Sequence, residues 1–368
     1  MKLKEICEYI SDRVAVAAIS KENYISTENM AQNQGGVTRA SSIPASGAVV
    51  RYNNNDILIS NIRPYFKKIW QANKIGGCSA DVLCIRAKEH IDSTFLYYLL
   101  SQDVFFEYVM TGAKGCKMPR GDKGHIMDWE IDIPEDKTEQ TAIGQCLKML
   151  DNKIEINKQI NDNLEQQASS LFSDWISTYP CRTYILSDIC NYANAKCDTS
   201  ILTPQNYIST ENMLPNKKGI VDSSNIPTGK VTCYKVDDVL IANIRPYFQK
   251  IWKADINGGC SADVLCIRAN IESHSPILYW LLHQDAFFEY VMTGAKGCKM
   301  PRGDKQHIMN WSIDLPEVQY WADLATQLGS IDQQIAYNRI ESINLSNLRD
   351  TLLPKLMSGE LKINEIDC

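Results

Sequence analysis

Apolar residues recur at alternating steps of three and four along two long stretches of the chain. From Lys137 to Trp175 these positions are Ile143, Leu147, Leu150, Ile154, Asn157, Asn161, Leu164, Ala168 and Leu171. In the second stretch they are Leu324, Leu328, Ile331, Ile335, Asn338, Ser342, Leu345, Arg349 and Leu352. This seven-residue repeat predicts coiled-coil helices, in which the matching polar interruptions at Asn157 and Asn338 fix the register. Each set of positions forms one stripe, or seam, along its helix, and antiparallel pairing of the two helices would bury both seams. The alternative is that each helix packs on its own domain.

Shorter patterns precede each long helix. The β-branched run DILISNI (Asp56–Ile62) predicts a strand, and Cys78–Ala87 predicts another. Ser93–Met110 has helical spacing, and the alternating segment His125–Pro134 predicts a strand that its proline ends. The region is therefore expected to form a small α+β domain.

The chain contains this domain twice. FFEYVMTGAKGCKMPRGDK occurs unchanged at Phe105–Lys123 and at Phe287–Lys305, an offset of 287 − 105 = 182 residues. The copies diverge most in a loop rich in Gly, Asn and Ser, Ala31–Gly47 in the first and Leu214–Gly229 in the second. A function that uses the same surface twice is expected, although a recent duplication or gene conversion also leaves identical copies.

These patterns predict an α+β fold with two similar globular domains and two long helices that pair as an antiparallel coiled coil, with pseudo-two-fold symmetry. The expected boundaries are 1–136 for the first domain, 137–176 for the central helix, 177–318 for the second domain, 319–360 for the distal helix and 361–368 for a tail. About 39 helical residues at ~1.5 Å each give a rod of roughly 55 Å. Such a rod would separate two binding surfaces by on the order of one to one and a half turns of B-DNA.

Composition is that of an ordinary globular protein, with 22% charged and 44% hydrophobic residues. No apolar stretch is long enough to span a bilayer and the N-terminus has no secretion signal, so a cytoplasmic protein without a membrane partner is expected. None of the 13 cysteines forms a Cys-x-x-Cys element, and most are expected to be buried free thiols.

Charge is unevenly distributed. The net charge of −6 argues against general binding to polyanions. Locally, however, Asn61–Lys74 carries four basic residues and no acid, and the loop Thr111–Lys123 of the duplicated segment adds Lys114, Lys117, Arg120 and Lys123 against Asp122 alone. This distribution favours selective docking of an anionic partner.

Catalytic motifs are lacking in the sequence. There is no Gly-x-x-x-x-Gly-Lys-Ser/Thr phosphate loop, no Gly-x-Gly-x-x-Gly loop after a strand, and no Asn-Pro-Pro-Tyr-like tetrapeptide of an adenine methyltransferase. Glu135-Asp136-Lys137 resembles half of a nuclease metal site, but its copy is Glu317-Val318-Gln319. His125 and His307 are isolated and are interpreted as structural. We therefore predict neither catalytic residues nor a metal site.

The basic clusters are the strongest functional signal. Lysines and arginines on a glycine-containing loop can follow a phosphate backbone, and an arginine can pair with a guanine edge. The alternative is an ordinary solvated loop beside a structural Tyr-Phe pair. The predicted DNA-contacting residues are Arg63, Tyr65, Lys67, Lys68, Lys114, Lys117, Arg120 and Lys123, with Arg245, Tyr247, Lys250, Lys296, Lys299, Arg302 and Lys305 in the second copy.

The helical segments resemble a known family. LDNKIEINKQINDNLEQQASSLFSDW (Leu150–Trp175), preceded by IPEDKTEQTAI (Ile133–Ile143), is similar to the central helical region of type I restriction-modification specificity subunits. LLPKLMSGEL (Leu352–Leu361) resembles the end of the distal helical region in the same family. The order of recognition domain, helix, recognition domain and helix covers essentially the whole chain. One element departs from the family pattern: the proline-then-glutamine start of the first helix, Pro134 and Gln140, is blurred in the second copy, where Pro316 leads into EVQYWADLA.

The resemblance implies a DNA-binding subunit that is not catalytic by itself. Family members bind two methyltransferase subunits, which carry S-adenosylmethionine and methylate adenine in double-stranded DNA, and can recruit translocating nuclease subunits. No cofactor is expected in this chain. Each recognition domain reads one half-site and the helices set the gap, so removing seven residues from the Ile143–Leu171 helix should shorten that gap. The competing interpretation is a non-catalytic coiled-coil scaffold whose paired domains bind protein.

Overall fold

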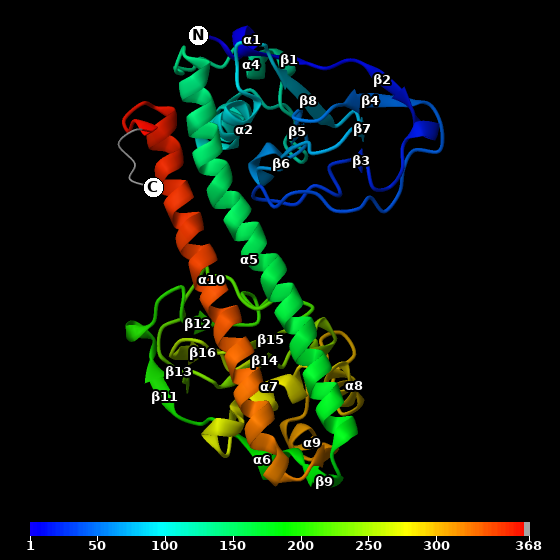
Figure 1. Cartoon of the computed structure of the whole chain (residues 1–368), viewed down its shortest axis with the longest axis vertical. Helices are drawn as coiled ribbons and strands as arrows, with labels where there is room; N and C mark the ends of the chain where they lie inside the picture. Colours follow the sequence, from blue (N-terminus) through cyan, green and yellow to red (C-terminus); the bar gives the residue numbers. More distant parts are fainter. Residues whose placement is uncertain (364–368) are drawn as a thin grey trace. The chain divides into compact units, whose positions relative to one another are not determined.

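The computed structural model describes residues 1–363, which divide into two compact units (Figure 1). The first unit combines Met1–Ile156 with the chain from Glu341 onward, and the second is Asn157–Ile340. Each unit contains one α+β domain and part of each long helix. No helix among the described residues is long and apolar enough to cross a membrane.

The first domain is built on two four-stranded sheets. One has the order β1-β8-β5-β6 and is antiparallel throughout; the other has the order β2-β4-β7-β3, with β3 parallel to β7. The run Ile-Leu-Ile-Ser of β5 is buried at all four positions, as a short continuous apolar run predicts. The strands are β1 (Cys7–Tyr9), β2 (Arg13–Ala15), β3 (Tyr24–Ile25), β4 (Ala48–Tyr52), β5 (Ile57–Ser60), β6 (Ile69–Gln71), β7 (Gly76–Cys78) and β8 (Val82–Ala87).

The helices of the first domain are short. The expected helix over Ser93–Met110 is broken at Gln102, whose ψ of 149° is extended, so α2 and α3 are separate helices. Asp92 caps α2, because its carboxylate accepts hydrogen bonds from the amides of Thr94 and Phe95, both at 2.9 Å. The helical elements are α1 (Leu3–Ile6), η1 (Val16–Ala18), η2 (Pro64–Phe66), α2 (Ser93–Ser101), α3 (Asp103–Thr111) and α4 (Lys123–Met127).

The second domain repeats both sheets, with strand orders β10-β17-β14-β15 and β11-β13-β16-β12. Its strands are β9 (Cys181–Ile185), β10 (Cys190–Tyr192), β11 (Lys196–Asp198), β12 (Tyr207–Ile208), β13 (Lys230–Tyr234), β14 (Val239–Ala242), β15 (Ile251–Lys253), β16 (Gly258–Cys260), β17 (Val264–Ala269) and β18 (Ser312–Pro316). Its helical elements are α6 (Leu186–Ile189), η3 (Thr199–Ile201), η4 (Pro246–Phe248), η5 (Glu272–His274), α7 (Ser275–Leu282), α8 (Asp285–Thr293), α9 (Lys305–Met309) and η6 (Val318–Tyr320).

The strand expected over His125–Pro134 is wrong for the first domain. His125 lies in α4, and of the following residues Glu130 makes an isolated bridge with Lys2. In the second domain His307 likewise lies in a helix, α9, but the last five of the corresponding residues form a strand, β18, because β9 supplies an antiparallel partner along its whole length. The alternation of apolar and polar residues was therefore not sufficient to form a strand, which also required a neighbouring strand as a partner.

The two long helices, α5 (Lys137–Thr178) and α10 (Trp321–Met357), lie side by side and antiparallel within each unit (Figure 1). In the second unit, Asn161 accepts a hydrogen bond of 2.8 Å from the amide of Asn338. Asn157 and Asn338 are both buried, and the Asn157 amide donates to the carbonyl of Asn338 at 3.4 Å. The predicted coiled coil is confirmed, and the polar interruptions of the two seams face one another.

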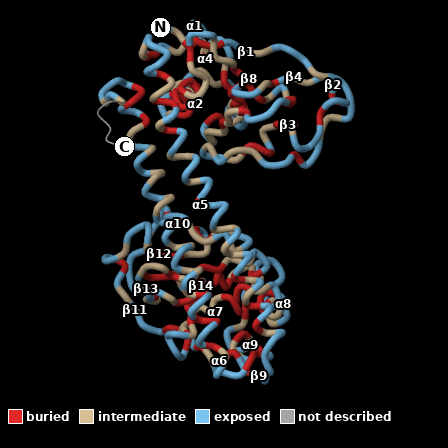
Figure 2. The backbone as a smooth tube through the Cα atoms, in the orientation of Figure 1, coloured by how far each residue is buried: buried red, intermediate tan, exposed pale blue. Residues whose placement is uncertain are grey.

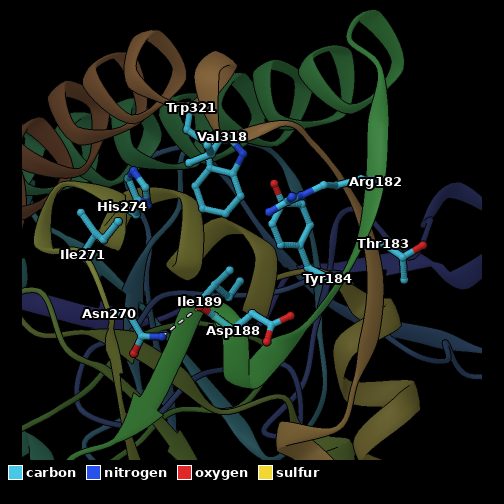
Figure 3. A pocket seen from close by; sticks show the side chains of 10 residues that line it. All are labelled: Arg182, Thr183, Tyr184, Asp188, Ile189, Asn270, Ile271, His274, Val318 and Trp321. Carbon is cyan, nitrogen blue, oxygen red and sulfur yellow. Dashed lines mark hydrogen bonds between the residues drawn. The ribbon is translucent and has the colours of Figure 1, made fainter.

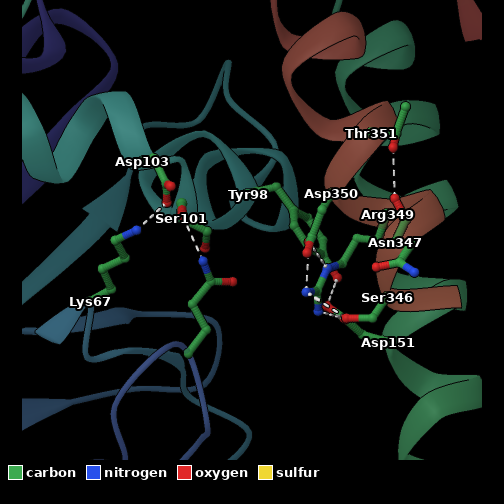
Figure 4. Close-up of polar contacts among 11 residues, drawn as sticks. Lys67, Tyr98, Ser101, Asp103, Asp151, Ser346, Asn347, Arg349, Asp350 and Thr351 are labelled. Atoms are coloured by element: carbon green, nitrogen blue, oxygen red, sulfur yellow. Dashed lines mark hydrogen bonds and ion pairs between the residues drawn. The ribbon is translucent and has the colours of Figure 1, made fainter. Parts of the chain in front are cut away.

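Each domain is joined to its helices by a half-buried carboxylate. In the first unit Asp151 of α5 accepts from the Tyr98 hydroxyl at 2.6 Å and from Arg349 of α10 at 2.7 Å (Figure 4). In the second, Asp332 of α10 accepts from Lys253 at 2.7 Å and from the Trp280 indole at 3.0 Å. Asp151 and Asp332 directly follow the corresponding seam residues Leu150 and Ile331. The first domain is therefore attached to α5 in the same way as the second domain is attached to α10.

Near the start of each long helix, a side chain donates a hydrogen bond to the carbonyl of the preceding proline, but the side chain differs between the two units. In the first unit the Gln140 amide donates to the carbonyl of Pro134 at 2.8 Å. In the second, the Trp321 indole donates to the carbonyl of Pro316 at 2.7 Å. The departure from the family pattern therefore preserves the connection between proline and helix while exchanging an amide for an aromatic ring.

Buried positions gather around α2 in the first unit and around α7 and α9 in the second (Figure 2). All 12 cysteines among the described residues are free, but only six are buried, so the expectation that most are buried is wrong. Cys116 and Cys298 are exposed and lie in the duplicated basic loop, Thr111–Lys123 in the first domain and Thr293–Lys305 in the second. Cys368 lies outside the described residues.

Candidate nucleic-acid interface

The sequence NIRPYF forms a strained turn at the surface of each domain. Arg63 has φ 51° and ψ 63°, a left-handed conformation that is uncommon for residues other than glycine. Its amide is held by the carbonyl of Pro119 at 2.8 Å, and the copy repeats this at Arg245, with φ 51° and a bond of 2.7 Å to Pro301. Strain that is preserved in this way is common at functional sites.

The turn and the duplicated basic loop lie against one another. Ile62 and Arg120 form an antiparallel bridge, and the amide of Gly121 donates to the carbonyl of Asn61 at 3.2 Å. A Cβ at Gly121 would lie 2.8 Å from Oδ1 of Asn61, so this close approach requires glycine. The second domain has the same bridge between Ile244 and Arg302. The structure thus brings together two clusters that the sequence predicted separately.

Two of the four cations in each basic loop already have acidic partners. Lys114 lies 2.7 Å from Asp122, and Arg120 pairs with Asp81. The hydrogen bond from Lys114, followed by that from the His125 amide, lowers the pKa of Asp122 to about 2. The second domain repeats these pairs, at 2.5 Å each, as Lys296–Asp304 and Arg302–Asp263. These residues can contact DNA only by exchanging a carboxylate for a phosphate or a base.

The loop lysines differ in their environment. Lys117 and Lys299 are exposed, and among residues 1–363 neither ammonium has a hydrogen-bond or ion-pair partner. Lys123 and Lys305 lie over tyrosine rings, with the ammonium nitrogens 5.6 Å and 5.5 Å from the ring centres. Lys117 and Lys299 are therefore the cations most available to a phosphate.

Lys68 and Lys250 point into the protein. Their ammonium groups donate to the carbonyls of Thr27 and Thr210, at 2.7 Å and 2.6 Å, and burial lowers the pKa of each lysine. They hold the segment NYISTENM beside the turn. Their prediction as DNA contacts stays untested, but their present contacts are structural.

Among residues 1–363, two buried polar atoms beside the turn have no hydrogen-bond partner, and both occur in each domain. They are Nε of Arg63 and Oδ1 of Asn61, with Nε of Arg245 and Oδ1 of Asn243 in the copy. Buried groups of this kind are normally satisfied, so an external partner is expected here. In the second domain Asn243 lines a pocket of about 530 Å³, together with Ala262, Lys296, Arg302, Gly303, Asp304, Lys305 and Gln306.

Aromatic side chains border the same turn. Tyr65 and Tyr247 are 45% and 49% exposed, and each ring centre lies 4.7 Å from that of the following phenylalanine. The exposed phenol groups can reach a phosphate or a base edge. No group of three or more His, Cys, Asp or Glu among the described residues could hold a metal ion.

A reciprocal exchange of lysine and glutamine links the divergent loop to the turn. In the first domain Lys67 donates to Asp103 at 2.7 Å (Figure 4). In the second the turn carries Gln249, and Asp285 receives Lys217 from the divergent loop at 2.6 Å. The position of Lys217 is occupied by Gln34 in the first domain, where its amide donates to the carbonyl of Ser101 at 2.7 Å. The aspartate pairs with a lysine in both domains, but that lysine comes from the turn in the first domain and from the divergent loop in the second. A comparison of the two copies at these positions could have identified the ion pair from the sequence.

We expect Lys67→Gln to lower the free energy of unfolding by about 0.2–1 kcal/mol, because the pair is largely exposed. Adding Gln34→Lys, which reproduces the arrangement of the second domain, should restore the loss. Urea denaturation measures both effects, with Lys117→Gln as a control that removes no partner. Failure of Gln34→Lys to restore stability in the Lys67→Gln background would contradict the exchange.

Comparison with known proteins agrees with this architecture. The family model of the type I restriction modification DNA specificity domain matches residues 1–166. The type I restriction enzyme MjaIX specificity subunit of Methanocaldococcus jannaschii is 22% identical over 309 residues, which cover 76% of this chain and 71% of that protein. The EcoDI specificity subunit of Escherichia coli is 22% identical over 329 residues, covering 74% and 70%.

A solved structure supplies the fold. The S subunit of a type I restriction-modification system from M. genitalium matches with a TM-score of 0.61 and 17% identity, covering 97% of this chain and 95% of that chain. The family model ends within α5, and the second domain repeats the elements of the matched first domain. Residues 1–166 thus match the type I restriction modification DNA specificity domain, and most of the chain is similar to specificity subunits of type I restriction enzymes.

Proposed function

We propose that this specificity subunit binds double-stranded DNA, with each domain reading one half of a split target through its NIRPYF turn and basic loop. The observation that carries the proposal is the double occurrence of one surface, including the unpartnered atoms of Asn61 and Arg63 and those of their copies. Buried polar groups are normally satisfied, so these atoms favour an external hydrogen-bond partner at the same place in both domains.

The chemistry of the surface fits nucleic acid. Arginine donates two parallel hydrogen bonds to the guanine edge, whereas lysines mainly neutralise phosphates. Arg120 and Arg302, held by aspartates, keep their positions until DNA displaces the carboxylates. This requirement gives selectivity, because an arbitrary polyanion must compete with a preformed ion pair.

The remaining subunits of the complex would carry the chemistry. We propose two methyltransferase subunits with bound S-adenosylmethionine as partners, with nuclease subunits recruited in addition. Support within the first unit comes from apolar side chains exposed on the paired helices: Met149 and Ile156 on α5, and Ile343 and Leu348 on α10, which are 44–58% exposed. Such side chains suit the apolar face of a partner helix. The chain itself is proposed to be non-catalytic and without a cofactor.

A salt titration of DNA binding tests this function. We expect affinity to fall steeply as salt rises, because phosphate contacts release counterions. The double variant Lys117→Ala/Lys299→Ala should reduce the slope of log affinity against log salt by about 1.8, at ~0.9 per contact. Both ammonium groups lack protein partners, so the fold should persist. Lys148→Ala, on α5, is the matched control and should leave the slope unchanged.

The scaffold interpretation predicts a different result. A flat response to salt, or no DNA binding with the methyltransferase subunit present, would favour it and reject the proposed function. A normal slope in the double variant would reject the loop lysines as phosphate contacts while leaving DNA binding intact.

A further inference from the structure

A second pocket, of about 410 Å³, lies where β9 meets the start of α10 in the second unit (Figure 3). It is separate from the basic surface and shares no lining residue with it. The residues that define its chemistry are Arg182, Tyr184, Asp188, Asn270, His274 and Trp321. The pocket therefore has no part in the proposed binding of DNA.

Three polar groups of the pocket lack hydrogen-bond or ion-pair partners among residues 1–363. The Tyr184 hydroxyl is buried and unsatisfied, on a side chain that is 6% exposed. The Arg182 guanidinium lies 4.3 Å from the centre of the Tyr184 ring and pairs with no carboxylate. The His274 ring is unpartnered too, and burial lowers its pKa. A cation and an unsatisfied hydroxyl together suit an anion.

The rest of the pocket is apolar and flat. The Trp321 ring centre lies 4.8 Å from that of His274 and 5.8 Å from that of Tyr184. Its indole N–H is already bonded to Pro316, so the ring contributes surface rather than a donor. Ile271 and Val318 line the pocket with side chains that are 53% and 54% exposed. These walls suit a planar apolar body.

The corresponding region of the first domain has the opposite character. Ile271, His274 and Val318 are replaced there by Glu89, Asp92 and Asp136, and Gln140 replaces Trp321. The Gln140 carbonyl oxygen accepts from the Asp92 amide at 3.0 Å. The three added acids outnumber the one added cation, Lys88 in place of Asn270, so they would repel an anion, and the aromatic wall is lost. The pocket is therefore a property of the second domain alone.

We propose that this pocket binds an organic carboxylate with a flat apolar or aromatic body. The carboxylate accepts hydrogen bonds from Arg182 and from the Tyr184 hydroxyl, and the body lies against Trp321. Asp188, the one acid of the lining, is exposed and accepts the Ile185 amide at 2.9 Å, so its charge is partly engaged. The carboxylate belongs either to a free small molecule or to a partner subunit that reaches this end of α10.

Calorimetric titration of the full chain with benzoate and indole-3-acetate, and with benzamide as neutral control, tests the proposal. We expect both carboxylates to bind at millimolar concentration and benzamide to bind at least about tenfold more weakly. Tyr184→Phe should weaken carboxylate binding about tenfold. It should leave the thermal midpoint unchanged or higher, because the hydroxyl has no protein partner. Arg182→Met should weaken binding at least as much, whereas Arg13→Met in the first domain should have no effect.

Adding the methyltransferase subunit separates the two sources. Displacement of the bound probe identifies a carboxylate of that partner, and simultaneous binding identifies a free ligand. Absence of saturable carboxylate binding, equal binding of benzamide, or unchanged binding in both Tyr184→Phe and Arg182→Met would overturn the proposal. DNA binding is independent of each of these results.

Discussion

The two halves of the DNA target will be the same sequence, or nearly so, in inverted orientation. The turn NIRPYF and the 19 residues Phe105–Lys123 are identical in the copies, and so are their strained backbone, ion pairs and unpartnered atoms. Identical donors and acceptors on one backbone geometry select the same base edges. Comparing the methylome of a host carrying this gene with that of a deletion strain measures the two half-sites directly.

Any difference between the half-sites should map to the divergent loops, Ala31–Gly47 and Leu214–Gly229. Replacing the second loop by the first should make the half-sites identical. The replacement must carry Gln249→Lys, because the transferred loop brings Gln34 and otherwise leaves Asp285 without a lysine. The loop exchange without Gln249→Lys is the matched control and should be less stable. Two unrelated half-sites in the natural target would be incompatible with this account.

Lengthening both paired helices by one heptad will lengthen the unspecified gap and leave the half-sites unchanged. A copy of Leu150–Ile156 inserted after Ile156, with a copy of Glu341–Asn347 inserted before Glu341, continues both seams. These insertions fall at the boundaries of the two units, so the contacts inside each unit are kept. Seven residues add about 10 Å of helix, or roughly three base pairs at ~3.4 Å.

Binding to a series of DNA probes with different gap lengths measures the shift. Inserting three residues instead of seven is the control, because it rotates the seams out of register and should abolish selective binding. An unchanged gap, or a change in the half-site sequences, would show that the helices do not set the spacing.

The amino-acid sequence by itself determined the architecture of this protein. The seam of α5 and α10, with Asn157 and Asn338 at matching positions, identified the coiled coil because helical pairing depends on a periodicity visible in one dimension. The exact repeat of Phe105–Lys123 identified two domains and one reused surface. The family resemblance followed from the same helical segments.

Tertiary structure decided how the basic residues are used. Asp81 approaches Arg120 from 39 residues away, and Asp103 approaches Lys67 from 36. Such pairs have no local periodicity, so a charge count could not separate them from the unpaired Lys117. The break at Gln102 depended in the same way on its extended backbone, which helical spacing over Ser93–Met110 did not reveal.

The pocket at Tyr184 illustrates the same limit. Its residues come from β9, α6, the segment around η5 and the start of α10, and no stretch of sequence contains them together. Periodicity and repetition are local properties and can be read along the chain. Whether a polar atom is satisfied depends on residues that only folding brings within hydrogen-bond distance.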